Sequence, residues 1–211
     1  MLVLEQACIQ YPGLSIDYPD IHIKPYEFVG IAGKSGCGKT SLLEARFGIN
    51  FAGTFHYAKA QLAGQDLVAL GERKRRWVSY CPQFSQNALN PRLTMEQHLL
   101  LTLKGNDLPY DPVHIERLLQ QLKLSTDLLG RYPSMLSGGQ KQRFVLFFCA
   151  VKQPRLLVLD EPSSAIDLIT LRSLVEFLSQ MRGQTTVLMV AHNWALLRRV
   201  ADRLILLSGE R

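Results

Sequence analysis

The residues with the clearest chemical potential lie in one loop, residues 33–40, which reads GKSGCGKT. Its glycines allow a tight backbone in which successive N–H groups point inward, an arrangement that binds anions. Lys39 adds a cation suited to β- and γ-phosphates, and the Thr40 hydroxyl is a hard oxygen ligand suited to Mg²⁺. The loop therefore predicts a nucleotide phosphate site. We expect contacts to the nucleotide from Gly33, Lys34, Ser35, Gly36, Cys37, Gly38, Lys39, Thr40 and Ser41.

Two adjacent carboxylates, Asp160 and Glu161, follow an apolar run at residues 156–159. Such a run is typical of a strand buried on both faces, and ligands of parallel sheets bind at the carboxyl edge of the strands. Asp160 is then placed to hold Mg²⁺ together with Thr40, and Glu161 to orient or deprotonate an attacking water. Adjacent carboxylates after a strand are usually solvated, but a preceding phosphate loop favours the catalytic interpretation.

A second group of backbone donors is expected at Ser137, Gly138, Gly139 and Gln140. Ser137 has the character of a helix N-cap, and the glycines after it leave amides exposed, so this helix start is a second anion site. We expect the helix to run from Lys141 to Lys152.

Three single residues are candidates for the nucleotide site, although each could also have an ordinary structural or solvated role. Tyr11 lies upstream of the phosphate loop, where its ring could stack on a purine or merely fill an edge between strands. Gln83 follows a predicted strand at residues 77–81, and alone it would be a solvated loop residue. A lone histidine is usually structural, but His192 ends an apolar strand at residues 185–191, at the sheet edge that also carries the carboxylates.

The elements that position these residues alternate between strands and helices. We expect a strand over residues 2–10, a strand before the phosphate loop and a helix after it, and short antiparallel strands between residues 53 and 67. Residues 93–132 have helical periodicity, with Thr94 and Gln97 as a capping pair. We therefore expect one domain over residues 1–211, with a helical subdomain inserted at about 84–152.

Composition restricts the class of protein. No apolar stretch among the 211 residues approaches the ~20 that a membrane-spanning helix needs, and we expect no secretory signal. The four cysteines lack metal-ligand or disulfide spacing, which predicts a reduced, cytosolic chain. The net charge of +6 is densest at residues 73–76. We expect a solvated turn there, with contact to lipid headgroups, a membrane partner or nucleic acid as the alternatives.

The ordered set of motifs resembles the nucleotide-binding subunit of an ABC transporter over essentially the whole chain. The resemblance rests on the phosphate loop, on Gln83 after Cys81-Pro82, on the run LSGGQ at 136–140, on Asp160-Glu161-Pro162, on the turn at residues 164–167 and on His192. It implies an α/β P-loop NTPase core with a mostly parallel sheet and flanking helices, plus an antiparallel β subdomain and an α-helical subdomain.

The resemblance also implies a mechanism and partners. Two subunits, from this chain or a related one, would sandwich two ATP molecules with Mg²⁺. Each nucleotide would lie between Lys39 of one chain and Ser137 and Gly139 of the other, with Gln83 and His192 near the γ-phosphate as catalytic residues and Gln83 also near the metal. The partners implied are transmembrane permease subunits and, indirectly, an extracytoplasmic solute-binding protein, without nucleic acid. The location implied is the cytoplasmic face of the inner membrane.

Within that family, residues 86–94 (QNALNPRLT) are similar to importers of peptides and nickel. Because the last predicted strand lies close to residue 211, we expect no C-terminal extension of the kind common in peptide-importing members, which favours nickel or a nickel chelate. The uncharged run from Cys81 to Pro91, including Phe84 and Leu89, is our candidate for a groove that receives the permease, with a self-packed loop as the alternative. Two alternative functions remain, a non-transport ABC ATPase that acts in DNA repair or on ribosomes, and a small-molecule kinase with the same phosphate loop. ABC ATPases of the first kind usually have long coiled-coil or zinc inserts or two ATPase cassettes in one chain. A kinase does not need the second anion site that LSGGQ provides.

Overall fold

A five-stranded parallel sheet lies at the centre of the molecule, with strand order β12-β5-β11-β10-β9. The coordinates are a computed structural model that describes residues 1–48, 51–164 and 166–207. Ala165, in the turn at residues 164–167, lies outside the described residues. The central strands are β5 (Phe28–Gly33), β9 (Val78–Cys81), β10 (Leu156–Asp160), β11 (Thr186–Val190) and β12 (Arg203–Leu207).

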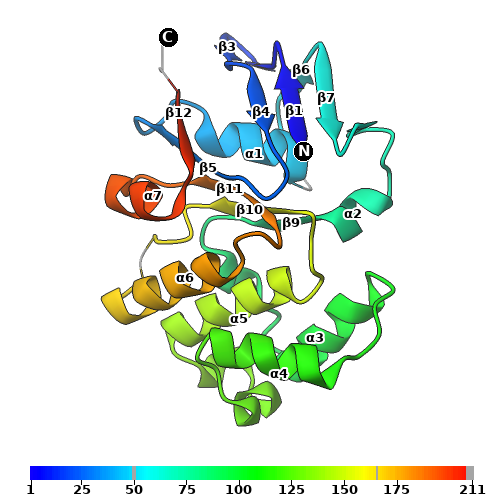
Figure 1. Ribbon diagram of the computed structural model, residues 1–211, viewed down its shortest axis with the longest axis vertical. Helices are drawn as coiled ribbons and strands as arrows, with labels where there is room; N and C mark the ends of the chain where they lie inside the picture. Colours follow the sequence, from blue (N-terminus) through cyan, green and yellow to red (C-terminus); the bar gives the residue numbers. More distant parts are fainter. Residues whose placement is uncertain (49–50, 165, 208–211) are drawn as a thin grey trace.

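Two antiparallel sheets cover one end of the molecule, with orders β4-β1-β7-β8 and β3-β2-β6 (Figure 1). The single strand expected over residues 2–10 is two strands, because Gln6 adopts a left-handed φ of 51° and ends the first one. The short antiparallel strands expected between residues 53 and 67 are confirmed. The strands are β1 (Leu2–Glu5), β2 (Cys8–Tyr11), β3 (Leu14–Asp17), β4 (Ile21–Ile23), β6 (Thr54–His56), β7 (Lys59–Leu62) and β8 (Gln65–Asp66).

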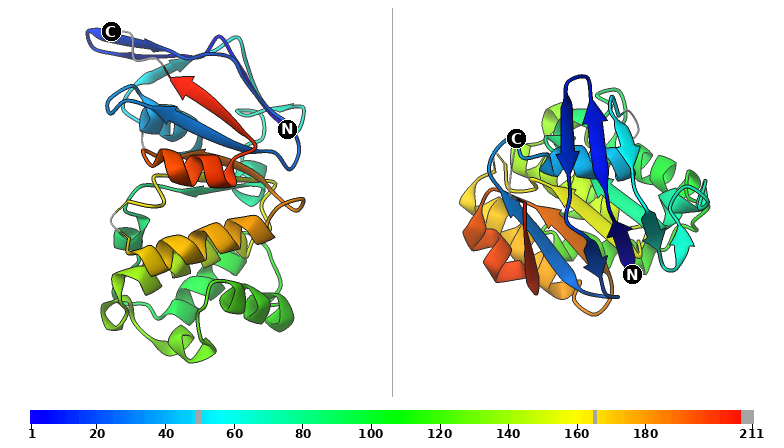
Figure 2. Two further views of the ribbon diagram at one scale, coloured as in Figure 1. Left: turned by 60° about the vertical axis from the view of Figure 1, so that its left-hand side comes forward. Right: turned by 90° about the horizontal axis from the view of Figure 1, so that it is seen from above.

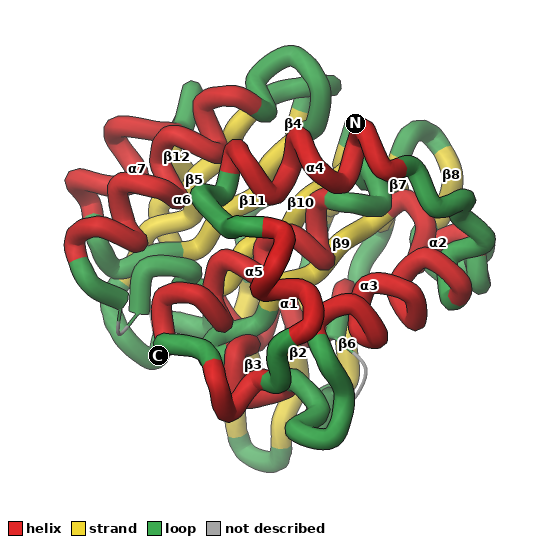
Figure 3. The backbone as a smooth tube through the Cα atoms, turned by 90° about the horizontal axis from the view of Figure 1, so that it is seen from below, coloured by secondary structure: helices red, strands yellow, loops and turns green. Residues whose placement is uncertain are grey.

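Helices fill the opposite end, between β9 and β10 in the chain. The segment begins with α3 (Met95–Lys104) and α4 (Pro112–Gln121) and ends with α5 (Gly138–Ala150). The predicted capping pair of Thr94 and Gln97 is confirmed, since each side chain bonds to the other's backbone. Seen from below, these helices lie in front of the strands (Figure 3). Short 3₁₀ helices complete the segment at Ser85–Ala88, Thr126–Gly130 and Pro133–Met135.

The basic cluster at residues 73–76 is helical, whereas we expected a turn. It forms α2 (Arg73–Trp77), in which Arg75 pairs with Glu72 across one helical turn at 3.5 Å. The Lys74 amine donates to the Arg46 carbonyl, which fastens α2 to the end of the helix after the phosphate loop. The remaining helices are α1 (Lys39–Phe47), α6 (Leu168–Gln180) and α7 (Trp194–Val200).

Two apolar cores lie on the two faces of the parallel sheet. Successive side chains of a strand point to opposite faces, so Leu157 and Leu159 pack with the helical segment, and Leu156 and Val158 pack with α1 and the antiparallel strands. Figure 2 shows the resulting stack, with antiparallel strands above the parallel sheet and helices below it. The parallel sheet is thus the rigid layer from whose edge the candidate site projects.

In the part of the chain that the structure describes, no helix combines the length and the apolar character needed to cross a bilayer.

Candidate nucleotide-binding and catalytic site

The predicted phosphate loop connects the end of β5 to the start of α1. Gly36 and Gly38 have φ values of 78° and 89°, a left-handed region that favours glycine and turns consecutive amides inward. Lys39 is only 6% exposed, and its Nζ donates to the carbonyls of Gly33 and Lys34, both at 2.9 Å. The ammonium group is therefore fixed inside the loop. The loop fits a phosphate chain because it combines directed backbone donors with a fixed cation.

The other predicted residues of the loop differ in exposure. Lys34 and Ser35 are exposed, Cys37 is buried, and Ser41 is half-buried at the start of α1. The buried Cys37 therefore packs beneath the loop, and the exposed pair lies at its surface.

Tyr18 supports this loop and was missed by the sequence analysis. Its hydroxyl donates to the Gly38 carbonyl at 2.9 Å, and burial raises the pKa of the phenol well above its usual value. A neutral, buried hydroxyl of this kind fixes the peptide that precedes Lys39. No local pattern marks Tyr18, because its partner lies 20 residues away.

Thr40 and Asp160 meet at the edge of the sheet, as predicted for a magnesium site. The Thr40 hydroxyl donates to Asp160 Oδ1 at 3.2 Å, and Asp160 is fully buried. Burial raises the pKa of Asp160 to about 6, and the neighbouring Glu161 charge acts in the same direction. Tyr80, which the sequence analysis also missed, donates to Asp160 Oδ2 at 3.5 Å. A buried carboxylate beside a hydroxyl is a donor set that fits a hard divalent cation.

Glu161 and His192 are brought together from the ends of adjacent strands. The His192 backbone N–H donates to Glu161 Oε2 at 3.1 Å, and His192 Nε2 lies 3.3 Å from Glu161 Oε1. Glu161 is 6% exposed and has a left-handed φ of 48°, a strained conformation for a residue with a side chain. The Glu161 N–H donates to the Val190 carbonyl at 2.9 Å, which holds this turn against the next strand.

The run at residues 137–140 lies at the start of α5, in the helical segment. Ser137 Oγ accepts from the Gln140 N–H at 3.2 Å, and the Ser137 N–H donates to Gln140 Oε1 at 2.9 Å. These bonds form a capping box, and within the described residues no hydrogen-bond acceptor pairs with the N–H groups of Gly138 and Gly139. In the described residues no hydrogen bond joins this run to the phosphate loop.

Gln83 and Tyr11 stand apart from these contacts. Gln83 is exposed two residues after β9 and has no side-chain hydrogen bond within the described residues. Tyr11 ends β2, half-buried, with its ring edge-on to Phe51 at a centroid distance of 5.8 Å. The structure thus brings together Thr40 with Asp160 and Glu161 with His192, but among the described residues no hydrogen bond joins Gln83, Tyr11 or residues 137–140 to either pair.

Comparison with known families decides the class of the protein. Residues 17–164 match the family model described as ABC transporter. The chain belongs to the ABC transporter family. That family's ATP-binding subunits are ATPases, so the chain is an ATPase.

Individual relatives of this ABC chain are similar over nearly its whole length. The thiamine import ATP-binding protein ThiQ of Photorhabdus laumondii is 36% identical over 98% of this chain and 86% of its own. The protein of the same name from Yersinia pseudotuberculosis is also 36% identical, over 100% of this chain and 88% of its own.

A solved ATP-binding subunit of an ABC transporter superimposes with a TM-score of 0.85 at 23% identity, covering 99% of this chain and 86% of that one. The ABC ATPase fold expected from the sequence, with a parallel core, antiparallel strands and helices, is therefore confirmed.

Proposed function

We propose that this ABC ATPase is a peripheral subunit of a membrane importer, where it hydrolyses ATP with Mg²⁺ to drive uptake. The observation that supports this best is the meeting of three groups at one edge of the parallel sheet: the fixed ammonium of Lys39, the Thr40–Asp160 pair and the Glu161–His192 pair. Phosphoryl transfer to water needs a positive cradle, a metal site and a base within one pocket.

Each residue then has a specific role. Lys39 and the amides of residues 33–41 hold the β- and γ-phosphates, and Thr40 and Asp160 hold Mg²⁺, which neutralises charge on phosphate oxygens when bound. Glu161 takes a proton from the attacking water, and the His192 amide keeps that carboxylate oriented. Gln83 reaches the γ-phosphate and the metal shell when the nucleotide is present, and Tyr11 stacks on the base.

The assembly that we propose is a dimer with this chain or a related one, bound to transmembrane permease subunits at the cytoplasmic face of the inner membrane. Residues 137–140 would complete the nucleotide site of the other subunit, because in the described part of the chain they form no hydrogen bond with the phosphate loop of their own subunit. An extracytoplasmic solute-binding protein would deliver the cargo, and no nucleic acid takes part. Within this assembly, residues 1–211 are one nucleotide-binding domain with an inserted helical subdomain at about 84–152.

The segment after Gln83 is our proposed contact to the permease. Phe84 is 49% exposed, and Leu89 is partly buried against the helical core and lines a hollow with Pro82 and Phe148. This hollow lies beside β9 and α5, so a movement of Gln83 would displace the adjoining loop that lines the hollow.

One loop and the similarity over the whole chain favour different cargoes for the importer. Residues 86–94 favour peptides or nickel, and one relative named as a dipeptide transport ATP-binding protein is 28% identical. The two relatives named for thiamine import are 36% identical over nearly the whole chain. Similarity over the whole chain involves far more residues than one loop does, so we place thiamine before nickel or peptides.

Substitution of Glu161 and of Lys39 separates chemistry from binding. Glu161→Gln keeps a side chain that can hydrogen-bond but removes the base, so we expect unchanged ATP affinity and at least about a hundredfold lower turnover. Lys39→Ala removes the cation of the loop, so both ATP binding and turnover should fall. Equilibrium binding of a labelled nucleotide and release of phosphate measure the two properties. Near-normal turnover by Glu161→Gln would remove Glu161 from the role of base.

A further inference from the structure

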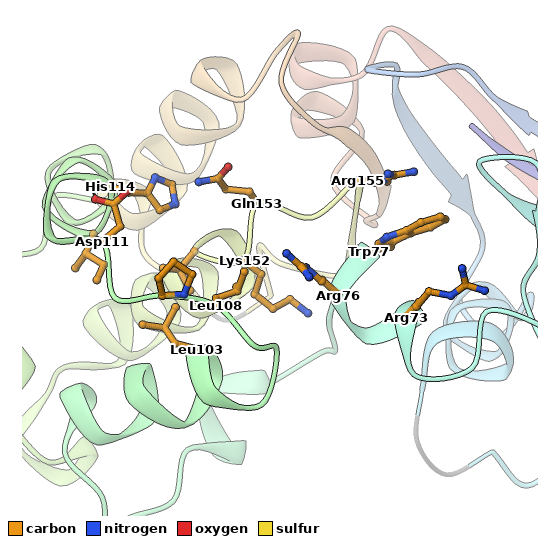
Figure 4. Close-up of a pocket in the computed structure, with 13 residues that line it drawn as sticks. Arg73, Arg76, Trp77, Leu103, Leu108, Asp111, His114, Lys152, Gln153 and Arg155 are labelled. Atoms are coloured by element: carbon orange, nitrogen blue, oxygen red, sulfur yellow. Dashed lines mark hydrogen bonds between the residues drawn. The ribbon is translucent and has the colours of Figure 1, made fainter.

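A cleft of about 480 Å³ lies between α2, the turn that joins α3 to α4, and the segment that joins α5 to β10. Figure 4 shows Arg73, Arg76 and Trp77 on the α2 side, with Leu103, Leu108, Asp111 and His114 on the side of α3 and α4. Lys152 and Gln153 lie between the two sides, and Arg155 lies beside Trp77 at the α2 side. The volume is within the range of small-molecule sites, about 300–1,000 Å³.

The charge of the cleft is strongly positive. Four of its lining residues are cations, Arg73, Arg76, Lys152 and Arg155, and Asp111 is its one carboxylate within the described residues. Asp111 is already occupied as the N-cap of α4, where it accepts from the His114 N–H at 3.1 Å. None of the four cations has a carboxylate within ion-pair distance in the described part of the chain.

The four cations differ in how firmly they are held. Lys152 Nζ donates to the carbonyls of Arg75 and Val78, at 2.5 and 2.9 Å, so this ammonium is fixed at the cleft. The guanidinium of Arg155 lies over the Trp77 ring at 3.9 Å, which orients it without neutralising it. Arg76 extends from α2 toward Lys152 in Figure 4. Arg76 and the fixed Lys152 together form a site for an anion, and Arg155 adds positive charge on the Trp77 side of the cleft.

The rest of the wall is apolar. Leu103 and Ile115 are buried residues that line the cleft, and Leu108 and Trp77 are half-buried there. A site that combines cations with an apolar wall suits a phosphate group and can also contact a carbon skeleton attached to it.

This cleft is separate from the nucleotide site. Arg155 directly precedes β10, and Asp160 is the last residue of that strand. The two ends of a strand of this length lie roughly 16 Å apart at 3.3 Å per residue. The cations of the cleft therefore lie at the opposite edge of the sheet from the phosphate loop.

We propose that this cleft binds a phosphate-bearing anion, with the phosphate held between Arg76 and Lys152 and its carbon skeleton against Trp77 and Leu108. Guanidinium groups bind phosphate through two parallel N–H donors, and the surplus of three positive charges, four cations against one carboxylate, fits a phosphate dianion. The phosphate comes from a soluble phosphate compound or from the headgroup of an anionic lipid.

Tryptophan fluorescence can report binding at this cleft. The chain has two tryptophans, and Trp194→Phe leaves Trp77, which lines the cleft, as the only one. The nucleotide site is first filled with ADP and Mg²⁺. Pyrophosphate is then titrated as the soluble probe, and phosphatidylglycerol-containing vesicles are compared with pure phosphatidylcholine vesicles as the lipid probe.

Matched charge-reversal variants test whether the change in Trp77 fluorescence comes from binding in the cleft. Arg76→Glu reverses an exposed cation of the cleft, and Arg131→Glu makes the same change at an exposed arginine outside it. We expect Arg76→Glu to weaken binding of the responding probe at least about tenfold, the usual effect of losing a hydrogen bond between charged groups, and Arg131→Glu to change it less than about twofold. Arg76→Gln, with circular dichroism on all variants, separates loss of charge from loss of fold.

The two possible sources of the phosphate predict different fluorescence responses to the two probes. A response to pyrophosphate that Arg76→Glu abolishes supports a soluble phosphate ligand, and a response to anionic vesicles alone with the same dependence supports a lipid headgroup. No response to either probe, or equal binding by the Arg76→Glu and Arg131→Glu variants, overturns the proposal. If neither probe binds but Arg76→Glu disrupts co-purification with a permease, the cleft is a protein contact and the proposal is wrong.

Discussion

At the scale of single residues, Asp160 couples metal binding to pH. Burial raises its pKa to about 6, above the value of about 3.9 of an unperturbed aspartate. Between these two values the folded chain binds more protons at this group than the unfolded chain does. The contribution of Asp160 to stability is therefore largest at low pH and is lost as the pH rises through 6.

Magnesium affinity should change in the opposite direction. A proton on Asp160 competes with the metal, so we expect the affinity for Mg²⁺ to fall about tenfold per pH unit below pH 6 and to be constant above pH 7. Calorimetric titration of Mg²⁺ into the complex with ADP measures this. Because the Tyr80 hydroxyl lowers the pKa of Asp160, Tyr80→Phe should move the midpoint to higher pH. A midpoint near pH 4 in both proteins would contradict the assignment.

Residues with a role in the site were predictable when their signal was local. Lys39, Thr40 and Asp160 follow from spacing relative to strands, since backbone geometry dictates which side chains reach an edge. Tyr18 and Tyr80 were not predictable, because each acts on a partner that lies 20 or 80 residues away. An isolated tyrosine in a strand-like region has the same pattern whether it supports a loop or fills a core.

At the scale of elements, α3 and α5 begin with the same capping box, built on Thr94 and Ser137. Replacing either residue by alanine should lower the free energy of unfolding by about 1 kcal/mol, the usual value of an N-cap. Only Ser137→Ala should also lower ATP turnover, because we propose that the start of α5 completes a partner's nucleotide site. Chemical denaturation and phosphate release on both variants test this. Equal turnover in the two variants would argue against a shared site.

Element boundaries were predictable where capping and periodicity are strong, as at Thr94. They were not predictable where a single backbone conformation or a distant contact decides. Gln6 breaks the first strand through a left-handed φ that its residue type does not signal. Residues 73–77 form a helix that the bond from Lys74 to the Arg46 carbonyl holds in place, and no such bond can be deduced from a run of basic residues.

At the scale of the whole molecule, the cargo hypothesis can be tested in cells. A strain whose only copy of this chain carries Glu161→Gln should assemble the transporter but lose uptake of its cargo. We expect labelled thiamine uptake to fall at least about tenfold and uptake of nickel and of a dipeptide to remain within about twofold. The strain with the unaltered chain is the control. Loss of nickel or dipeptide uptake with normal thiamine uptake would reverse the order that we propose.

The fold as a whole was predictable because its motifs occur in a fixed order, but the stacking of layers was not. The order β12-β5-β11-β10-β9 places the last strand of the chain beside the strand of the phosphate loop. Burial of both faces of such a sheet requires two separate cores, and the sequence alone does not show which apolar residues join which core.

The position of Lys39 has a consequence for the entropy of nucleotide binding. A free lysine side chain loses about 1.5–2 kcal/mol of conformational entropy when it becomes ordered. Here the ammonium is already held by the carbonyls of Gly33 and Lys34, so this loss occurs during folding. An arriving phosphate exchanges partners with a cation that is already in place, and the ordering of Lys39 is not subtracted from the affinity for nucleotide.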